Sequence, residues 1–291
     1  MNRFYLATRL AALASLAFTN VHAHAETKGR NSPVFISVKP LAYADVADMV
    51  MAAPVIAKVR VKSAQHLSGK AATGVIPGRK RYVMTGDVMT LIRGDGGIAP
   101  RITWLVDQAA DARGKFPKLA KVEVIVLAHR VAGQPGEVQL VSPDAQLFMT
   151  ADAGLRAHAI AAEAASPAAP PVITGITDAF YTPGPVDGES TSQIFLATRD
   201  DRPVSIGVVR QPGHEPAWSL FLKETVGDGT PPPRRDTLLW YRLACALPDA
   251  LPANAATGLP VTDKAKLDQD YALVRSQLGA CTRTIKPPVA R

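Results

Sequence analysis

Two adjacent prolines near the middle of the chain restrict its folding most, because they end a run of six residues that suits neither a helix nor a sheet. The run is Ser166-Pro167-Ala168-Ala169-Pro170-Pro171. Proline lacks the amide hydrogen that helix and sheet hydrogen bonding requires, and it fixes its own backbone angle. We therefore expect residues 166–171 to be an extended Pro/Ala linker between two domains of ordinary size, 26–165 and 172–291.

The first expected domain carries the alternating pattern of strands that have one face in a core. In residues 55–61, for example, small apolar side chains occupy every second position. Five such segments, joined by short glycine-containing links, predict a five-stranded antiparallel barrel or sandwich: 55–61, 81–93, 101–107, 121–131 and 137–141. Helices are expected on either side, over 41–52 and 150–165, the second with Thr150 as its N-cap.

The second expected domain, 172–291, predicts a small antiparallel sheet followed by two C-terminal helices. Its strand-like segments are 172–180, 193–198, 204–210 and 218–224, and the turn residues between them favour a four-stranded meander. Asp236 is expected to cap the first helix, which Pro248 ends, and Thr262 to cap the second. The expected fold class is therefore β-rich α+β.

Residues 1–25 have the features of a secretory signal peptide. Arg3 and Arg9 precede a short apolar stretch, and small residues lead up to Ala25. The apolar stretch is too short to span a bilayer core, and no later stretch approaches the length required. We expect cleavage near Ala25 and a periplasmic or secreted product without a transmembrane segment. A buried N-terminal helix is the alternative.

The chain has two cysteines, Cys245 and Cys281. In an oxidising compartment such a pair commonly forms a disulfide, and the chain-entropy model gives about 4 kcal/mol of stabilisation for a loop of this length. We expect this bond, with two buried free thiols as the alternative. Neither residue belongs to a Cys-x-x-Cys pair, so a thioredoxin-type role has little support.

Positive charge is concentrated in the first expected domain. Residues 26–150 contain 17 Lys or Arg and 10 Asp or Glu, a net charge of +7, whereas residues 151–291 contain 14 and 15, a net charge of −1. Such a field attracts anionic partners. For an exported protein we expect a phosphate-bearing or acidic envelope polymer, or an acidic envelope protein, and not nucleic acid.

Six basic residues make up the candidate binding site. Lys58, Arg60 and Lys62 share one face of an expected strand, and Arg79-Lys80-Arg81 introduces the next one. If these strands pair antiparallel, the two groups should approach each other. An anionic polymer or head group on this face would gain charge-assisted contacts that weaken as salt rises. The alternative is a charged face that keeps the sheet soluble and blocks edge pairing.

No motif in the sequence assigns a catalytic residue, a metal ion or a cofactor. The Gly-x-Ser-x-Gly and Walker patterns are absent, and after His214-Glu215 a zinc-protease helix would need a histidine where Trp218 stands. Four carboxylates flank the strand 193–198 and leave a hydrolase of envelope polymers open: Asp187, Glu189, Asp200 and Asp201. Because aspartate also favours turns, solvated turn residues are the simpler interpretation.

The first expected domain resembles a known family. Its order of helix, valine-rich strand, long strand ending Leu91-Ile92-Arg93-Gly94, strand and Val124-Ile125-Val126-Leu127 is similar to the netrin-type branch of OB-fold barrels. The resemblance implies an OB-like barrel. Family members that inhibit metalloproteases place an N-terminal cysteine on the target's zinc, but here the first cysteine is Cys245. The inhibitory mechanism is therefore not implied.

The second expected domain is similar to uncharacterised exported proteins of alphaproteobacteria. The similarity lies in Gln193-Ile194-Phe195-Leu196-Ala197-Thr198 and Leu239-Trp240-Tyr241-Arg242-Leu243-Ala244-Cys245. It implies export but no activity. We therefore expect an exported, noncatalytic binding or structural protein of the cell envelope. The alternatives are the hydrolase described above and a protein-protein adaptor that uses an exposed sheet edge.

Overall fold

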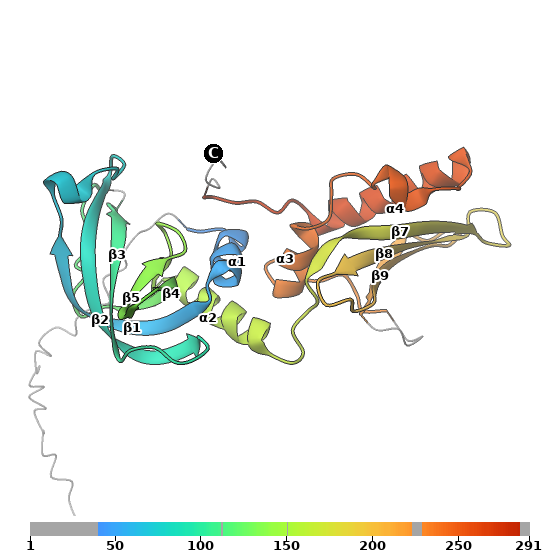
Figure 1. Cartoon of the computed structure of the whole chain (residues 1–291). Coiled ribbons are helices and arrows are strands. Elements are labelled where there is room, and N and C mark those ends of the chain that lie inside the picture. The colour runs from blue at the N-terminus through green and yellow to red at the C-terminus, as the bar shows by residue number, and fades with distance from the viewer. Residues whose placement is uncertain (1–39, 112, 150, 223–228, 286–291) are drawn as a thin grey trace, which may run out of the picture. The chain divides into compact units, whose positions relative to one another are not determined.

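Five strands in the first half of the chain close into a barrel (Figure 1). The computed structural model describes residues 40–111, 113–149, 151–222 and 229–285. The barrel strands are β1 (Val55–His66), β2 (Arg79–Arg93), β3 (Arg101–Ala109), β4 (Glu123–Val131) and β5 (Gln134–Leu140). They are hydrogen-bonded in the order β1-β2-β3-β5-β4, and β4 also pairs with β1. This is the strand order of an OB-type barrel, so the expected OB-like architecture is confirmed.

The barrel departs from the expected antiparallel arrangement at one place. β3 and β5 run parallel, and among the described residues they pair only at Thr103 and Glu137. The reason is that β5 follows β4 as an antiparallel hairpin strand and then lies between β4 and β3. A short strand, β6 (Gln146–Phe148), pairs with β4 and was not expected, because three residues are too few to show an alternating pattern.

Alternate side chains of the strands fill the barrel. Val59, Val61 and Met84 are fully buried, and Trp104 is 2% exposed. The indole N–H of Trp104 donates a 2.8 Å hydrogen bond to Gln146, which satisfies the one polar atom that this side chain buries. A Cβ at Gly86 would lie 2.5 Å from Val59, so the tight β1–β2 contact requires glycine there.

Both expected flanking helices are present. α1 (Tyr43–Ala52) buries Val46, Ala47 and Val50, and α2 (Asp152–Ala165) buries Ala157 and Ile160. Thr150, the expected cap of α2, lies outside the described residues. A short 3₁₀ helix, Gly69–Ala72, follows β1.

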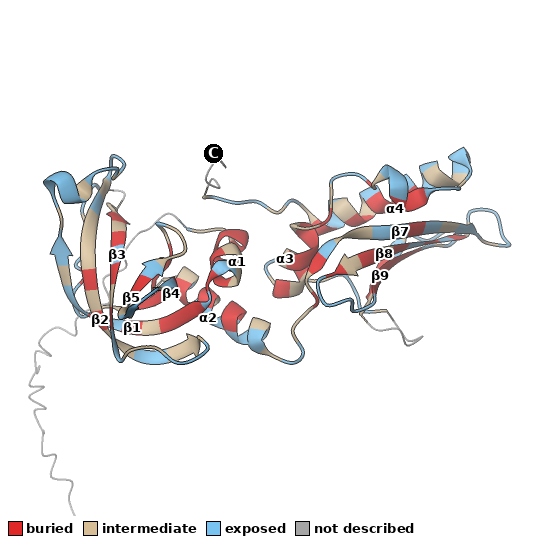
Figure 2. Ribbon diagram, in the orientation of Figure 1, coloured by how far each residue is buried: buried red, intermediate tan, exposed pale blue. Residues whose placement is uncertain are grey.

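The second half of the chain contains the expected four-stranded antiparallel sheet. Its strands are β7 (Ile173–Pro183), β8 (Ser190–Thr198), β9 (Val204–Arg210) and β10 (Ala217–Phe221), in the meander order β10-β9-β8-β7. The helices α3 (Leu238–Ala244) and α4 (Val261–Leu278) follow, with a 3₁₀ helix, Ala253–Ala256, between them. Figure 2 shows α4 along this sheet with buried residues on its inner side.

The caps of α3 and α4 differ from those expected. Thr237 caps α3, because its hydroxyl accepts a hydrogen bond from the Trp240 amide at 3.2 Å, whereas Asp236 has a φ of 60° and lies outside the helix. α4 begins at Val261 after Pro260, so Thr262 lies within its first turn. One side of α4 is buried, and its residues recur at helical spacing: Leu267, Tyr271, Val274 and Leu278.

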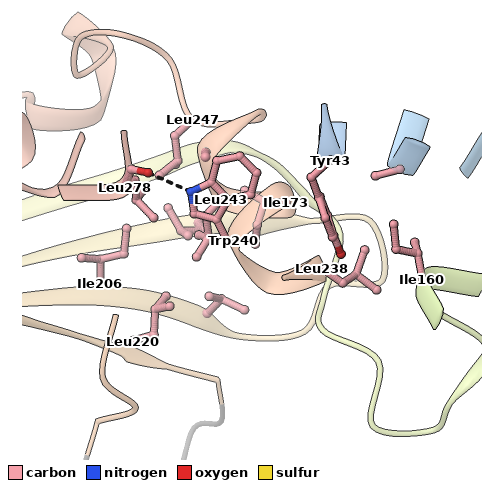
Figure 3. Close-up of a cluster of buried hydrophobic side chains, with 14 of the residues drawn as sticks. Tyr43, Ile160, Ile173, Ile206, Leu220, Leu238, Trp240, Leu243, Leu247 and Leu278 are labelled. Atoms are coloured by element: carbon pink, nitrogen blue, oxygen red, sulfur yellow. Dashed lines mark hydrogen bonds between the residues drawn. The ribbon is translucent and has the colours of Figure 1, made fainter. Parts of the chain in front are cut away.

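A hydrophobic cluster joins the helices to the second sheet. In Figure 3 Trp240 lies beside Leu243 and Leu278, and its indole N–H donates a 2.8 Å hydrogen bond to the Leu278 carbonyl. The ring of Tyr43 in α1 meets Trp240 edge-on, with centroids 6.2 Å apart. Aromatic pairs in this geometry contribute about 0.5–1.5 kcal/mol beyond the area that they bury.

Cys245 and Cys281 form the expected disulfide, with their Cα atoms 5.1 Å apart. It ties the end of α3 to the residues that follow α4. All described residues belong to one compact unit, Phe35–Arg291. Residues 166–172 join α2 to β7 without helix or strand, and the division into two domains stays a prediction. Among the described helices, none has the length and apolar character needed to cross a membrane.

Candidate anion-binding face

The outer face of β1 presents three of the basic residues that the sequence singles out. Lys58, Arg60 and Lys62 have side chains that are 31%, 48% and 53% exposed, whereas Val59 and Val61 between them are buried in the barrel. This is the alternation expected of a strand with one wet face. We call the outer side of β1, with the side chains that contact its cations, the β1 face.

Two carboxylates from neighbouring strands lie among these cations. Glu123 in β4 contacts Lys58 and Arg60, each at 2.7 Å. Asp87 in β2 contacts Lys62 at 3.0 Å and Arg101 at 2.8 Å. The strand register explains both contacts, because Arg60 lies opposite Glu123 on one side and opposite Asp87 on the other. Each carboxylate pairs with two cations, so each group of three charged side chains has a net charge of +1.

The cations keep these carboxylates ionised. Hydrogen bonds from Lys58 and then Arg60 hold the pKa of Glu123 below its ordinary value. Arg101 and Lys62, in that order, do the same for the pKa of Asp87. Opposite charges at this distance favour the charged form of both partners. At neutral pH the β1 face is therefore a network of charges with a positive excess.

An open groove of about 950 Å³ runs beside this network. Its charged lining residues are Arg60, Lys62, Lys121 and Glu123, and Val122 and Met149 supply apolar surface; Val61, whose side chain is buried in the barrel, completes the lining. A ligand in the groove would therefore meet three cations from two strand regions. The mixture of charged and apolar lining residues suits a polar ligand with a non-polar backbone.

Lys121 is a groove residue that the sequence reasoning did not identify. It precedes β4, and its amide donates a 2.9 Å hydrogen bond to the Val61 carbonyl, which places it next to β1. Its φ of 66° lies in the left-handed region, which is unfavourable for lysine. The only sequence signal was its basic side chain at the start of an expected strand.

The second basic triplet, Arg79-Lys80-Arg81, is largely occupied by contacts within the protein. Arg79 pairs with Asp144 at 2.6 Å and Arg81 with Asp107 at 2.7 Å. The ammonium of Lys80 lies 4.4 Å from the centre of the Phe116 ring. Of the three, only Lys80 is exposed, so this triplet offers fewer free contacts than the β1 face.

The two triplets do not meet as expected. β1 continues to His66, which pairs with Tyr82, so Arg81 lies beside the end of β1. Lys62 lies between positions paired with Gly86 and Thr85. At about 3.3 Å per residue, Arg81 and Lys62 are on the order of 15 Å apart along the sheet. The hairpin is longer than the alternating pattern showed, and this separates the two groups.

The four acidic residues considered for hydrolysis do not form one cluster. Asp187 and Glu189 precede β8, whereas Asp200 and Asp201 follow it. A nine-residue strand is about 30 Å long, while paired catalytic carboxyl groups lie about 5–10 Å apart. Asp200 accepts a 2.6 Å hydrogen bond from Arg202, and Asp201 has a φ of 53°, which is typical of a turn.

Asp187 and Glu189 share a small pocket with two basic residues. The pocket has a volume of about 290 Å³ and includes Arg210 and Lys266 in its lining. Arg210 is itself paired with Asp270 at 2.5 Å. Asp187 and Glu189 therefore share this pocket with two cations, and Asp200 and Asp201 are not part of its lining. In the described ranges, no three His, Cys, Asp or Glu side chains are placed to hold a metal ion.

Comparison with protein-family models, with curated protein sequences and with solved structures finds no match to this chain. An OB-type barrel hosts many functions, so its presence alone does not select one. The evidence for a function therefore comes from the residues of the β1 face and its groove.

Proposed function

We propose that the protein is an exported, noncatalytic binding component of the cell envelope, and that its β1 groove holds a segment of an anionic polymer or an anionic head group. The excess of cations in and around the groove carries this proposal. Five cations surround only two carboxylates, Glu123 and Asp87, and they are Lys58, Arg60, Lys62, Arg101 and Lys121. This excess attracts anions and orients them toward the groove.

The spacing of the cations suits a ligand with repeated charges. Arg60 and Lys62 are two residues apart in β1 and therefore about 7 Å apart along the strand. Successive carboxylate or phosphate groups can each meet one cation, and Lys121 in the lining of the same groove offers a further contact. Such contacts are charge-assisted hydrogen bonds, and salt screens them because the face is exposed.

The leader-like residues 1–25 and the Cys245–Cys281 bond support export, because disulfides persist in oxidising compartments. Cell fractionation followed by N-terminal sequencing tests this part. We expect a mature chain that begins near Glu26 in the periplasm or the medium. A full-length chain in the cytosol with two titratable thiols contradicts it.

Retention on a polygalacturonate resin and on lipopolysaccharide-coated beads tests the binding. The test variant carries Lys62→Gln and Lys121→Gln, and the control carries Lys264→Gln and Lys266→Gln in α4, which removes the same charge elsewhere. We expect the wild type and the control to elute at the same salt concentration and the test variant to elute earlier. Neutral dextran should retain none of them. Equal elution of the two variants, or no retention on either anionic matrix, rejects the proposed site.

The seam between β3 and β5 favours a second candidate function, that of a protein adaptor. Beyond Thr103 and Glu137 these two strands are not paired with each other in the described residues, and residues of both line a groove of about 730 Å³. Leu105 is 53% exposed in this groove. An extended segment of an envelope protein would add its backbone to β3 there. A partner that is lost with Leu105→Asp but retained with Lys62→Gln and Lys121→Gln would identify this function.

A further inference from the structure

The carboxylate of Asp45 in α1 is covered by residues from the other end of the chain. Asp45 is 3% exposed and accepts four hydrogen bonds. One comes from the Ala42 amide at 3.0 Å, within the start of α1 itself. The other three come from the Thr284 amide at 2.8 Å, the Thr284 hydroxyl and the Ile285 amide at 3.1 Å. A buried carboxylate needs such donors, because burying it without them is costly.

A second carboxylate of α1 holds the same segment. Asp48 accepts hydrogen bonds from Arg283, at 2.5 Å from Nε and 3.2 Å from Nη2. The hydroxyl of Tyr241 in α3 donates to the same carboxylate at 2.7 Å. We call residues 282–285 the C-terminal strap. Its fixation depends on Asp45 and Asp48, and its Ile285 side chain packs against the hydrophobic cluster.

The disulfide lies immediately before the strap. Cys281 is bonded to Cys245, the C-cap residue of α3, and only Gly279 and Ala280 separate it from the end of α4. Both cysteines are partly exposed, so a reductant can reach the bond. Ordering each free residue costs about 1–2 kcal/mol, and the bond removes part of that cost by fixing one end of the strap.

We infer that the Cys245–Cys281 disulfide holds the C-terminal strap on α1, and that reduction of this bond releases the strap. A dithiol reductant supplies two electrons and two protons, breaks the sulfur-sulfur bond to two cysteine thiols and is itself oxidised to a disulfide. The strap then keeps its hydrogen bonds, the Arg283–Asp48 ion pair and the packing of Ile285, and these contacts alone have to offset the ordering cost of a free chain end. Its release exposes Asp45 and removes Arg283 from Asp48, which is already partly exposed, so an acidic surface on α1 becomes accessible in the reduced protein.

Hydrogen exchange of the full mature chain, oxidised and after dithiothreitol, tests this inference. We expect exchange of the Thr284 and Ile285 amides and of the first turn of α1 to rise at least about tenfold on reduction. Exchange in β8 and β9 should stay nearly unchanged, because neither cysteine lies in that sheet. Unchanged exchange in the strap and α1 overturns the inference. A uniform rise that includes β8 and β9 also overturns it, since the bond would then act on the whole fold.

A second variant keeps the inference testable if the reduced protein does not stay folded. Asp45→Asn, with the disulfide intact, removes the carboxylate that holds the strap. We expect it to raise exchange at Thr284 and Ile285 as reduction does, without new thiols. Asp263→Asn, in the first turn of α4, is the matched control and should leave both amides protected. Full protection of the strap in Asp45→Asn shows that Asp45 does not hold it and rejects the proposed mechanism.

Discussion

The guanidinium of Arg210 in β9 donates a 2.6 Å hydrogen bond from Nε to the carboxylate of Asp270 in α4, a side chain with no solvent exposure. Ser192 in β8 donates to the other carboxylate oxygen at 2.5 Å. The two donors come from neighbouring strands and the acceptor from the helix that covers them. This arrangement fixes where α4 lies along the sheet, because a buried carboxylate is stable only where its donors are.

Removing Asp270 should destabilise the protein strongly. We expect Asp270→Ala to lower the free energy of unfolding by about 3 kcal/mol, the lower end of the range for a broken buried ion pair, because Arg210 can partly reach solvent. Asp268→Ala is the control, since Asp268 is exposed and pairs with Lys264 along the helix, and should cost less than about 0.5 kcal/mol. Urea unfolding measures both. Similar losses would show that the buried pair has no special role.

Glu123 should make part of the free energy of unfolding sensitive to acid. It should also limit the affinity of the β1 face for anions. Because Lys58 and Arg60 lower the pKa of Glu123, this stabilisation is fully present above about pH 4.5 and is lost as the pH falls through the lower folded-state pKa. Glu123→Gln should flatten that part of the stability curve. The loss at neutral pH should stay below about 1 kcal/mol, because the side chain is partly exposed.

The same Glu123→Gln variant should bind polygalacturonate more tightly, since Lys58 and Arg60 lose their internal partner. Unfolding followed between pH 2 and 7 and elution salt on the resin are the two measurements. Glu137→Gln, which removes a carboxylate from β5, controls for the general change in net charge. Weaker retention of Glu123→Gln than of this control would show that Glu123 itself contributes to the binding site.

Substitutions at Lys121 should weaken binding with little effect on the free energy of unfolding. Its left-handed backbone costs lysine about 1–2 kcal/mol, whereas glycine adopts it without strain but loses more chain entropy on folding. We therefore expect Lys121→Gly to change the free energy of unfolding by less than about 1 kcal/mol while weakening polymer retention. Lys121→Gln should weaken retention equally. Retention that survives both substitutions would remove Lys121 from the site.

The C-terminal strap should loosen in acid. Burial alone would raise the pKa of Asp45, but hydrogen bonds from Thr284, Ile285 and Ala42 hold it below its ordinary value of 3.8. The strap is therefore fully stabilised above about pH 3.8 and weakened as the pH falls through the folded-state value. The other titratable groups beside it are Asp48, Arg283 and Tyr241.

The amide resonance of Thr284, followed by NMR from pH 6 to pH 2, measures this loosening. It should shift with the titration of Asp45, and Asp45→Asn should abolish the transition. A transition that persists in Asp45→Asn would contradict the assignment of the acid response to Asp45.

Much of the fold can be predicted from the sequence, because strands such as β3 and β8 alternate buried side chains with more exposed ones. The alternation in residues 55–61 predicts β1, and the spacing of Leu267, Tyr271, Val274 and Leu278 predicts the buried side of α4. The parallel contact of Thr103 with Glu137 cannot be predicted from the sequence, because it depends on where the β4–β5 hairpin lies in the barrel. β6 is too short to leave a pattern. The caps expected at Asp236 and Thr262 are wrong because Thr237 caps α3 and because α4 already begins at Val261, directly after Pro260.

The candidate site can be predicted from the sequence only in part, because strand periodicity does not determine which strands pair. Strand periodicity places Lys58, Arg60 and Lys62 on one face, but it does not show which acids the pairing register brings beside them. Glu123 and Asp87 reach the β1 face from β4 and β2, and this decides how much positive charge stays free. Lys121 enters the groove through an unusual backbone angle, which has no sequence pattern.

The affinity of the wild type and of the Lys62→Gln, Lys121→Gln variant for soluble polygalacturonate, measured at several salt concentrations, tests the central claim most directly. If each lost cation removes about 0.7 kcal/mol of exposed charge-assisted contact, the dissociation constant of the variant rises about tenfold at low salt, and the difference shrinks as salt increases. The Lys264→Gln, Lys266→Gln control should match the wild type. Equal affinity of all three proteins, or a difference that salt leaves unchanged, contradicts the account.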